Sequence, residues 1–127
     1  MDTHILIRWL SEAKKLSRTQ HRVLESAIRR GEPVAFSAMC LMEIAVLTGG
    51  GRTLLRTSIE EFFEDLSANP AFQVLPLTYE IAREVALLAA LRDPADRAIV
   101  ATARVHRLRL VTSDQRIVAS KMVAVIE

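Results

Sequence analysis

Four carboxylates stand at positions where chemistry, rather than folding alone, explains their presence: Asp2, Glu43, Asp96 and Asp114. Glu43 is the clearest case, because it is the only charged residue in the apolar run 38–47. We expect this run to be buried, and a lone buried carboxylate is costly unless it is paired, protonated or bound to a cation. If the four acids meet in space, their mutual repulsion predicts a divalent metal ion among them.

The chemistry that such a cluster supports depends on hard cations. Carboxylates and water suit Mg²⁺ or Mn²⁺ better than soft metals. One or two such ions can activate a water molecule and stabilise the charge that builds on a phosphodiester during in-line displacement. Thr112 and Ser113 precede Asp114 and are candidates to bind that water or to orient a carboxylate. Hydroxyl groups that only satisfy the backbone at a strand end are an equally good explanation.

The four acids also have simpler explanations. An Asp at the N-cap, a Pro at the first helical position and an acid two residues later are usual at a helix start, which favours a capping role for Asp93 and leaves Asp96 open. Asp114 can cap the turn that follows it, and Asp2 can be a disordered terminal residue. For Glu43 the simpler explanation is a buried ion pair, for instance with Arg97.

Composition indicates one globular domain, residues 1–127, with enough apolar residues for a core. The net charge is only +2, but 14 of the 17 basic residues are Arg. Arg matches phosphate geometry, so this bias mildly favours a polyanionic partner, although codon usage and helix propensity explain it equally well. The single cysteine, Cys40, excludes an internal disulfide and fits a reducing compartment. Without a Cys/His ligand set, an apolar leader or a membrane-length apolar run, we expect a cytoplasmic protein with no structural zinc site and no membrane contact.

Periodicity and punctuation predict short strands that alternate with helices. The expected strands are 34–37, 72–77, 108–112 and 123–126. The first expected helices are 11–30, the Glu43 segment up to the glycines 49–51, and 58–69, which starts with a Ser58–Glu61 capping box. Further helices are expected from Thr78 and from 93–96 onward, with a short helical turn over 114–120. This order is typical of an α/β fold with a parallel sheet covered on both faces. Sites in such folds lie at the carboxyl ends of the strands, and Asp114 falls just past one.

Four segments also resemble a known family when they are taken in order. They are Asp2–His4, Ser37–Ala38 with Glu43–Ala45, Asp93–Ala103 and Leu110–Asp114, and the last two are specific in combination. The chain resembles a PIN-domain ribonuclease of the VapC toxin type, from bacterial or archaeal toxin–antitoxin pairs, and the resemblance covers essentially the whole chain. It implies a three-layer α/β/α sandwich with a short parallel sheet and Mg²⁺- or Mn²⁺-dependent endonucleolytic cleavage of RNA. It also implies a homodimer and a cognate antitoxin.

The same resemblance assigns roles to individual residues. It implies that the metal ligands and catalytic acids are Asp2, Glu43, Asp96 and Asp114, with Asp93, Arg97, Thr112 and Ser113 as accessories. Arg97 would contact phosphate or orient a carboxylate, and Thr112 matches the hydroxyl residue of the last motif.

One departure from the family concerns the start of the chain. Members have a short apolar strand at the centre of the sheet before the first Asp, whereas only Met1 precedes Asp2 here. We therefore expect either a start upstream of Met1 or a truncated first strand with an open sheet centre. In the second case the chain should be weakly active.

Two other function classes remain open. A phosphoacceptor module would also have an acidic Mg²⁺ pocket, but it needs a Lys after a late strand, and Lys121 stands beside the final strand instead. A domain that only binds RNA or a protein would leave Glu43 unexplained unless Arg97 pairs with it. Trp9, the only tryptophan, is the residue we would watch as part of a partner or dimer surface.

Overall fold

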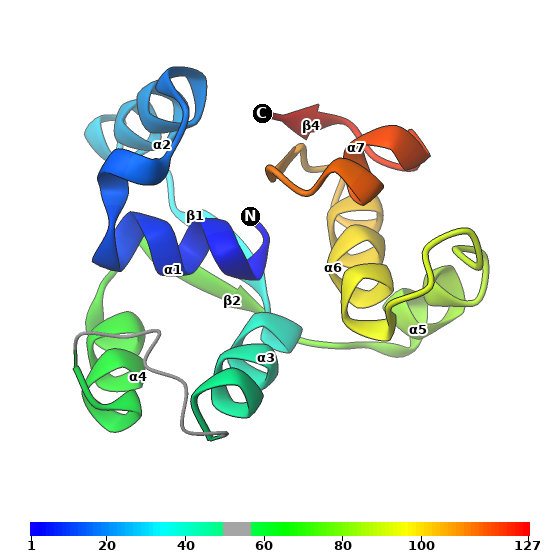
Figure 1. Cartoon of the computed structure of the whole chain (residues 1–127), viewed down its shortest axis with the longest axis horizontal. Coiled ribbons are helices and arrows are strands. Elements are labelled where there is room, and N and C mark those ends of the chain that lie inside the picture. The colour runs from blue at the N-terminus through cyan, green and yellow to red at the C-terminus, as the bar shows by residue number, and fades with distance from the viewer. Residues whose placement is uncertain (50–56) are drawn as a thin grey trace.

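The computed structural model describes residues 1–49 and 57–127 (Figure 1). Its helices are α1 (Thr3–Ser11), the 3₁₀ turn η1 (Ala13–Lys15), α2 (Arg18–Arg29), α3 (Ala38–Gly49), α4 (Ile59–Ala68), α5 (Tyr79–Val85), α6 (Pro94–Val105) and α7 (Gln115–Ser120). Its strands are β1 (Val34–Ser37), β2 (Phe72–Leu75), β3 (Leu110–Val111) and β4 (Val125–Ile126). No helix in the described ranges is long and apolar enough to cross a membrane.

Helix starts follow the local sequence signals. The side chain of Ser58 accepts a hydrogen bond from the Glu61 N–H at 3.2 Å, so Ser58 is the N-cap of α4 and one of the two bonds of the predicted capping box is present. Thr78 caps α5 in the same way, and Asp93 caps α6 with Pro94 at the first helical position. These predictions are confirmed because each depends on contacts within one turn of the chain.

The single helix predicted over residues 11–30 is wrong in extent. The chain leaves helical geometry at Glu12, makes the short turn η1, and starts α2 only after Ser17. Ser17 and Gln20 form a reciprocal capping box, so the local hydrogen bonding favours a new helix start over a continuous helix. The helix predicted to stop at the glycines 49–51 ends at Gly49, and the other two glycines lie outside the described residues.

The later strands are shorter than predicted. The strand expected over 72–77 ends at Leu75, and those expected over 108–112 and 123–126 keep only two residues each. Arg107 has a positive φ of 55° in the turn after α6, so the chain becomes extended only a few residues later. The strands pair in parallel, β1 with β2 and β3 with β4. The parallel α/β architecture is therefore confirmed.

The sheet is divided in the middle, between β1 and β3, and the first two residues bridge the gap. The amino group of Met1 donates to the Ala35 carbonyl of β1 at 3.0 Å, and the Asp2 N–H donates to the Val111 carbonyl of β3 at 3.1 Å. A cavity of about 350 Å³ opens beside them, lined by Met1 together with residues of β1, β3 and α6. The expectation of an open sheet centre agrees with this arrangement.

One core joins the elements around this gap. Helix α1 crosses in front of β1 and β2 in Figure 1, while α6 contacts both α3 and β1. The largest fully buried side chains include Ile5 and Leu6 of α1, Phe36 of β1, Ile44 of α3 and Val100 of α6. Helices α1, α3 and α6 are thereby fixed against each other, and each of them brings a carboxylate toward the carboxyl ends of the strands.

Individual inward-facing residues were not all placed correctly from the sequence. Helical periodicity places Ile28 on the same side of its helix as Leu24 and predicts that Ala89 is buried, yet both Ile28 and Ala89 are exposed. Trp9 is partly buried and packs edge-on against Phe72, with ring centroids 5.3 Å apart. Trp9 therefore belongs largely to the core and has less exposed area to offer to a partner or dimer surface.

Candidate functional site

Asp2 is a structural part of the site rather than a loose terminal residue. Its side chain is only 6% exposed, and its Oδ1 accepts a hydrogen bond from the Ile5 N–H at 3.1 Å as the N-cap of α1. Its Oδ2 accepts a hydrogen bond from the Thr112 hydroxyl. The alternative of a disordered Asp2 is wrong, because the carboxylate is fixed by α1 and by the end of β3.

Thr112 connects Asp2 to Asp114. The buried Thr112 hydroxyl donates to Asp2 and accepts a hydrogen bond from the Asp114 N–H at 3.0 Å. Asp114 in turn caps α7, since its Oδ1 accepts from the Arg116 N–H at 2.9 Å. The predicted hydroxyl role of Thr112 thus has a definite geometry: it orients one acid and fixes the backbone of the other.

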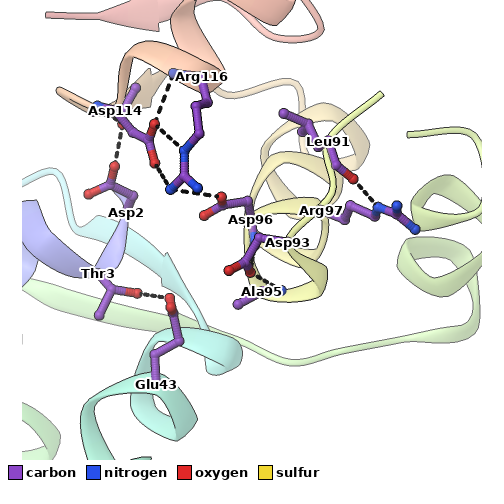
Figure 2. A network of polar contacts seen from close by, with 11 residues as sticks. Asp2, Thr3, Glu43, Leu91, Asp93, Ala95, Asp96, Arg97, Asp114 and Arg116 are labelled. Carbon is purple, nitrogen blue, oxygen red and sulfur yellow. Dashed lines mark hydrogen bonds and ion pairs between the residues drawn. The ribbon is translucent and has the colours of Figure 1, made fainter. Parts of the chain in front are cut away.

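Asp93 and Asp96 divide into a cap and an inward-facing acid. Asp93 Oδ1 accepts from the N–H groups of Ala95 and Asp96 at 2.8 and 3.1 Å, so its capping role is confirmed. The Asp96 side chain is 15% exposed and lies toward Asp114 (Figure 2). Desolvation raises the pKa of Asp96 to about 6, and the negative charges of Asp93 and Asp114 add to that shift. Like charges therefore do gather at the start of α6.

Arg116 is the residue that the sequence analysis missed. Its Nε and one terminal nitrogen bind the two oxygens of Asp114 at 3.2 and 2.9 Å, and the same terminal nitrogen lies 3.6 Å from Asp96 Oδ2. Figure 2 shows the guanidinium between the two carboxylates. The hydrogen bond from Arg116 is the main reason that the pKa of Asp114 is lowered, and Asp114 likewise raises the pKa of Arg116. The spacing of an Asp and an Arg across one residue at a helix start was the available signal.

Glu43 lies on the other side of the site and is less buried than expected. Its side chain accepts a hydrogen bond from the Thr3 hydroxyl, and its residue is only partly buried. The prediction that the whole run 38–47 is buried is wrong, since Met42 is 62% and Val46 68% exposed. Helix α3 turns a second apolar face to the surface, so its composition overstated its burial.

Arg97 does not pair with Glu43. Its Nε donates to the Leu91 carbonyl, and in Figure 2 its guanidinium points away from the four acids on the far side of α6. The ion-pair explanation for Glu43 is therefore wrong for the described residues. Among the described residues no contact joins Arg97 to a site carboxylate, so a role in orienting one is not supported. A contact of Arg97 with phosphate stays a prediction.

Ser113 contributes to the loop rather than to a carboxylate. The Gln20 amide nitrogen donates to the Ser113 hydroxyl at 3.0 Å and to the Thr112 carbonyl at 3.3 Å. Gln20 is fully buried, so α2 holds the chain between β3 and α7 in place. This support could not be inferred from the sequence, because 92 residues separate Gln20 from Thr112.

The donor set fits a hard divalent cation at one place in particular. In the described residues no group of three or more His, Cys, Asp or Glu side chains is close enough to hold a metal ion. Asp96 and Asp114 nevertheless come from different elements and already share one cation, the guanidinium of Arg116. Mg²⁺ commonly binds through one or two carboxylates and keeps several waters. The carboxylates of Asp96 and Asp114 therefore match the type and the number of protein ligands that this ion uses. Asp2 and Glu43 have hydroxyl partners of their own, Thr112 and Thr3, and neither adds a third carboxylate to the pair in the described residues.

Comparisons with known proteins agree with this geometry. The family model described as PIN domain matches residues 1–121. Among curated proteins, "Ribonuclease VapC22" of Mycobacterium tuberculosis (strain ATCC 25618 / H37Rv) is 29% identical over 119 residues, covering 92% of this chain and 87% of that protein.

Two solved structures share the fold. "Toxin-antitoxin complex from Klebsiella pneumoniae" is 23% identical with a TM-score of 0.65, covering 99% of this chain and 93% of the other. "Crystal Structure of FitAcB from Neisseria gonorrhoeae" is 24% identical with a TM-score of 0.69, covering 99% and 94%. These likenesses show that the fold found here is one that solved proteins adopt over nearly the whole chain.

Proposed function

The chain belongs to the PIN-domain family, and from that membership we propose that it is a metal-dependent endoribonuclease, the toxin of a toxin–antitoxin pair. The observation that carries the proposal is the meeting of Asp96 and Asp114, from separate elements, around a single cationic group. A relative named as a ribonuclease, aligned over 92% of this chain, supports the choice of RNA as substrate.

Each of the four acids has a proposed role in binding Mg²⁺ or Mn²⁺. Asp96 and Asp114 are the proposed primary ligands, and Asp2 and Glu43 complete the acidic set beside them. A bound ion would act as a Lewis acid and lower the pKa of its water, which supplies the nucleophile for phosphodiester cleavage. Thr112 keeps Asp2 and the Asp114 backbone in fixed relation. Because the pKa of Asp96 is about 6, its carboxylate is largely ionised at neutral pH and available to a cation.

The partners follow from the same proposal. The solved neighbour from Klebsiella pneumoniae is titled a toxin–antitoxin complex, so we propose a cognate antitoxin for this chain as well. A homodimer is part of the proposal, and the exposed Met42 and Val46 of α3 offer apolar area for an interface of either kind.

The proposal is tested by incubating the protein with RNA in Mn²⁺ and in EDTA, beside Asp96→Asn and Glu43→Gln. We expect cleavage in Mn²⁺ only, with a loss of about a hundredfold or more in Asp96→Asn, since metal ligation and charge are both removed. Arg30→Gln serves as the matched control, because Arg30 pairs with the exposed Glu32 far along the chain from the site acids.

The outcomes separate the function classes. Cleavage that survives EDTA or persists in both acid variants contradicts a metal-dependent site. RNA binding without any cleavage identifies a binding module instead. Label taken up from a small phosphodonor, without cleavage, identifies a phosphoacceptor.

A further inference from the structure

Arg116 is the one basic side chain that the structure places among the acids of the site, within the described residues. Its guanidinium makes a fork with Asp114 and reaches Asp96 with the same nitrogen that binds Asp114 Oδ2. A fork of this kind matches a carboxylate well. The positive charge therefore occupies the place between the two acids that the proposed function assigns to a metal ion.

We infer that Arg116 is a built-in counter-cation that occupies the metal position between Asp96 and Asp114 and that a divalent ion must displace it to bind. The inference rests on the proposed function, because it concerns the same two carboxylates. It adds a residue that sets metal affinity, which neither the sequence motifs nor the acidic quartet contains.

The contacts of Arg116 allow such an exchange. Its side chain is 73% exposed, whereas those of Asp96 and Asp114 are 15% and 23% exposed. The guanidinium can therefore swing into solvent while the acids stay in place. An exposed ion pair contributes little to stability, so an ion with twice the charge can replace the guanidinium.

Backbone contacts keep the acids ready after the exchange. Asp114 still accepts from the backbone N–H of Arg116, and its own N–H still binds Thr112, whatever the Arg116 side chain does. Asp96 is fixed by the first turn of α6 behind the Asp93 cap. Displacement of the guanidinium thus leaves a preformed pair of carboxylates rather than a disordered one.

The alternative is that Arg116 is only a surface ion pair that stabilises the start of α7. In that case its removal would lower thermal stability and leave metal affinity unchanged. If the metal ion and the Arg116 guanidinium compete for the same two carboxylates, removing the guanidinium must tighten metal binding.

The experiment measures Mn²⁺ binding directly, from the loss of the free-ion signal in electron paramagnetic resonance, at neutral pH. The proteins are the parent, Arg116→Gln, Arg116→Lys and the control Arg30→Gln. Arg30→Gln removes the same charge from an exposed Arg–carboxylate pair outside the site, so it reports the effect of net charge alone. We expect Arg116→Gln to bind Mn²⁺ about fivefold more tightly or better. Arg116→Lys should fall between it and the parent, and Arg30→Gln should match the parent.

The outcomes distinguish this inference from the function on which it rests. Equal or weaker Mn²⁺ binding in Arg116→Gln, with binding by the parent intact, overturns the role of Arg116 and leaves the metal site standing. No binding by any variant overturns both. If Arg116→Gln does not fold by circular dichroism, Arg116→Lys decides, because it keeps the charge and loses the fork. The shift of the melting temperature by Mn²⁺ gives a second readout, which should be larger in Arg116→Gln than in the parent.

Discussion

The Asp114 side and the Glu43 side of the site are supported by different amounts of structure. On the Asp114 side, the acids receive backbone N–H groups, the Thr112 hydroxyl and the fork of Arg116. On the Glu43 side, the hydrogen bond found in the described residues comes from the Thr3 hydroxyl. The first side is therefore organised before any ion arrives, whereas the second depends on one contact between α1 and α3.

This difference reflects how each side is built. Asp114 follows a strand and starts a helix, so its own neighbours in sequence supply donors. Glu43 sits in the middle of α3, where the backbone N–H groups are used by the helix itself. A carboxylate in that position can be oriented only by side chains from other elements. We expect perturbations on the Asp114 side to cost more than equivalent ones on the Glu43 side.

The largest difference should appear when one hydroxyl is removed from each side. Thr112→Val leaves Oδ2 of the buried Asp2 without its donor and the Asp114 N–H without its acceptor, which should lower the free energy of unfolding by about 3 kcal/mol. Thr3→Val removes the bond to the partly exposed Glu43 and the contact of the Thr3 hydroxyl with the Cys40 thiol, with an expected cost of about 1 kcal/mol. Both are close to isosteric. Urea unfolding of the metal-free proteins measures the loss of stability in each variant. Equal losses in Thr112→Val and Thr3→Val would contradict the difference between the two sides of the site.

A second prediction concerns the gap that both sides adjoin. A short Val/Ile-rich leader placed ahead of Asp2 should enter the cavity between β1 and β3 and add backbone hydrogen bonds there. We expect a gain of about 2 kcal/mol, or roughly 5–8 °C in melting temperature, together with faster RNA cleavage. Met1 is only 7% exposed, and this burial lowers the pKa of its amino group.

The control for that experiment is a Gly/Ser leader of equal length, which moves the amino group out of the site without adding apolar side chains. An equal gain from both leaders would mean that relief of the buried amino group, rather than filling of the sheet, is responsible. No gain in melting temperature or cleavage from either one contradicts the view that the open sheet centre weakens the protein.

Local signals explain which parts of the structure could be predicted from the sequence. Strand 34–37 and the caps at Ser58 and Asp93 were placed correctly, because turn residues and capping geometry act over a few positions. The order of strands and helices was sufficient for the fold class. Strand ends were overestimated, since pairing with a neighbour sets them and that neighbour is distant in sequence.

The sequence indicated two acids that the fold brings together, Asp96 and Asp114, but it did not indicate their partners. Asp96 and Asp114 stand out by motif, but Gln20 and Thr3 act through contacts that span most of the chain or join two helices. Glu43 was misjudged because a run of apolar residues in a helix cannot show which of its faces is covered. Arg116 was overlooked because an Arg two residues after an Asp is only a weak signal at a helix start, and the fold alone brings the second carboxylate beside it.

The smallest expected effects are changes in the stability of the metal-free protein when the pH is varied or a single acid is replaced by its amide. The pKa of Asp96 is raised from 3.8 to about 6, so between these values the native state holds a proton that the unfolded state has lost. The stability of the native state therefore falls as pH rises through this window, and above it the ionised Asp96 carries the full penalty. Asp96→Asn should be more stable than the parent at pH 7.5 by about 1 kcal/mol, a figure reduced for partial solvent exposure, and the advantage should vanish near pH 4.

Glu43→Gln gives the matched comparison from the other side of the site. Glu43 contributes less to the pKa of Asp96 than Asp93 or Asp114 does, and a Gln can still accept from Thr3. We expect its stability to differ from the parent by less than about 0.5 kcal/mol at pH 7.5 in EDTA, with a small gain if any. Thermal unfolding from pH 4 to 8 measures both variants. A larger gain in Glu43→Gln than in Asp96→Asn would place the strongest repulsion at Glu43 and reverse the comparison between the two sides. A clear loss of stability in Glu43→Gln would show that its charge is stabilised in the folded protein, and Glu43 would then not belong with the acids whose charges repel each other at the start of α6.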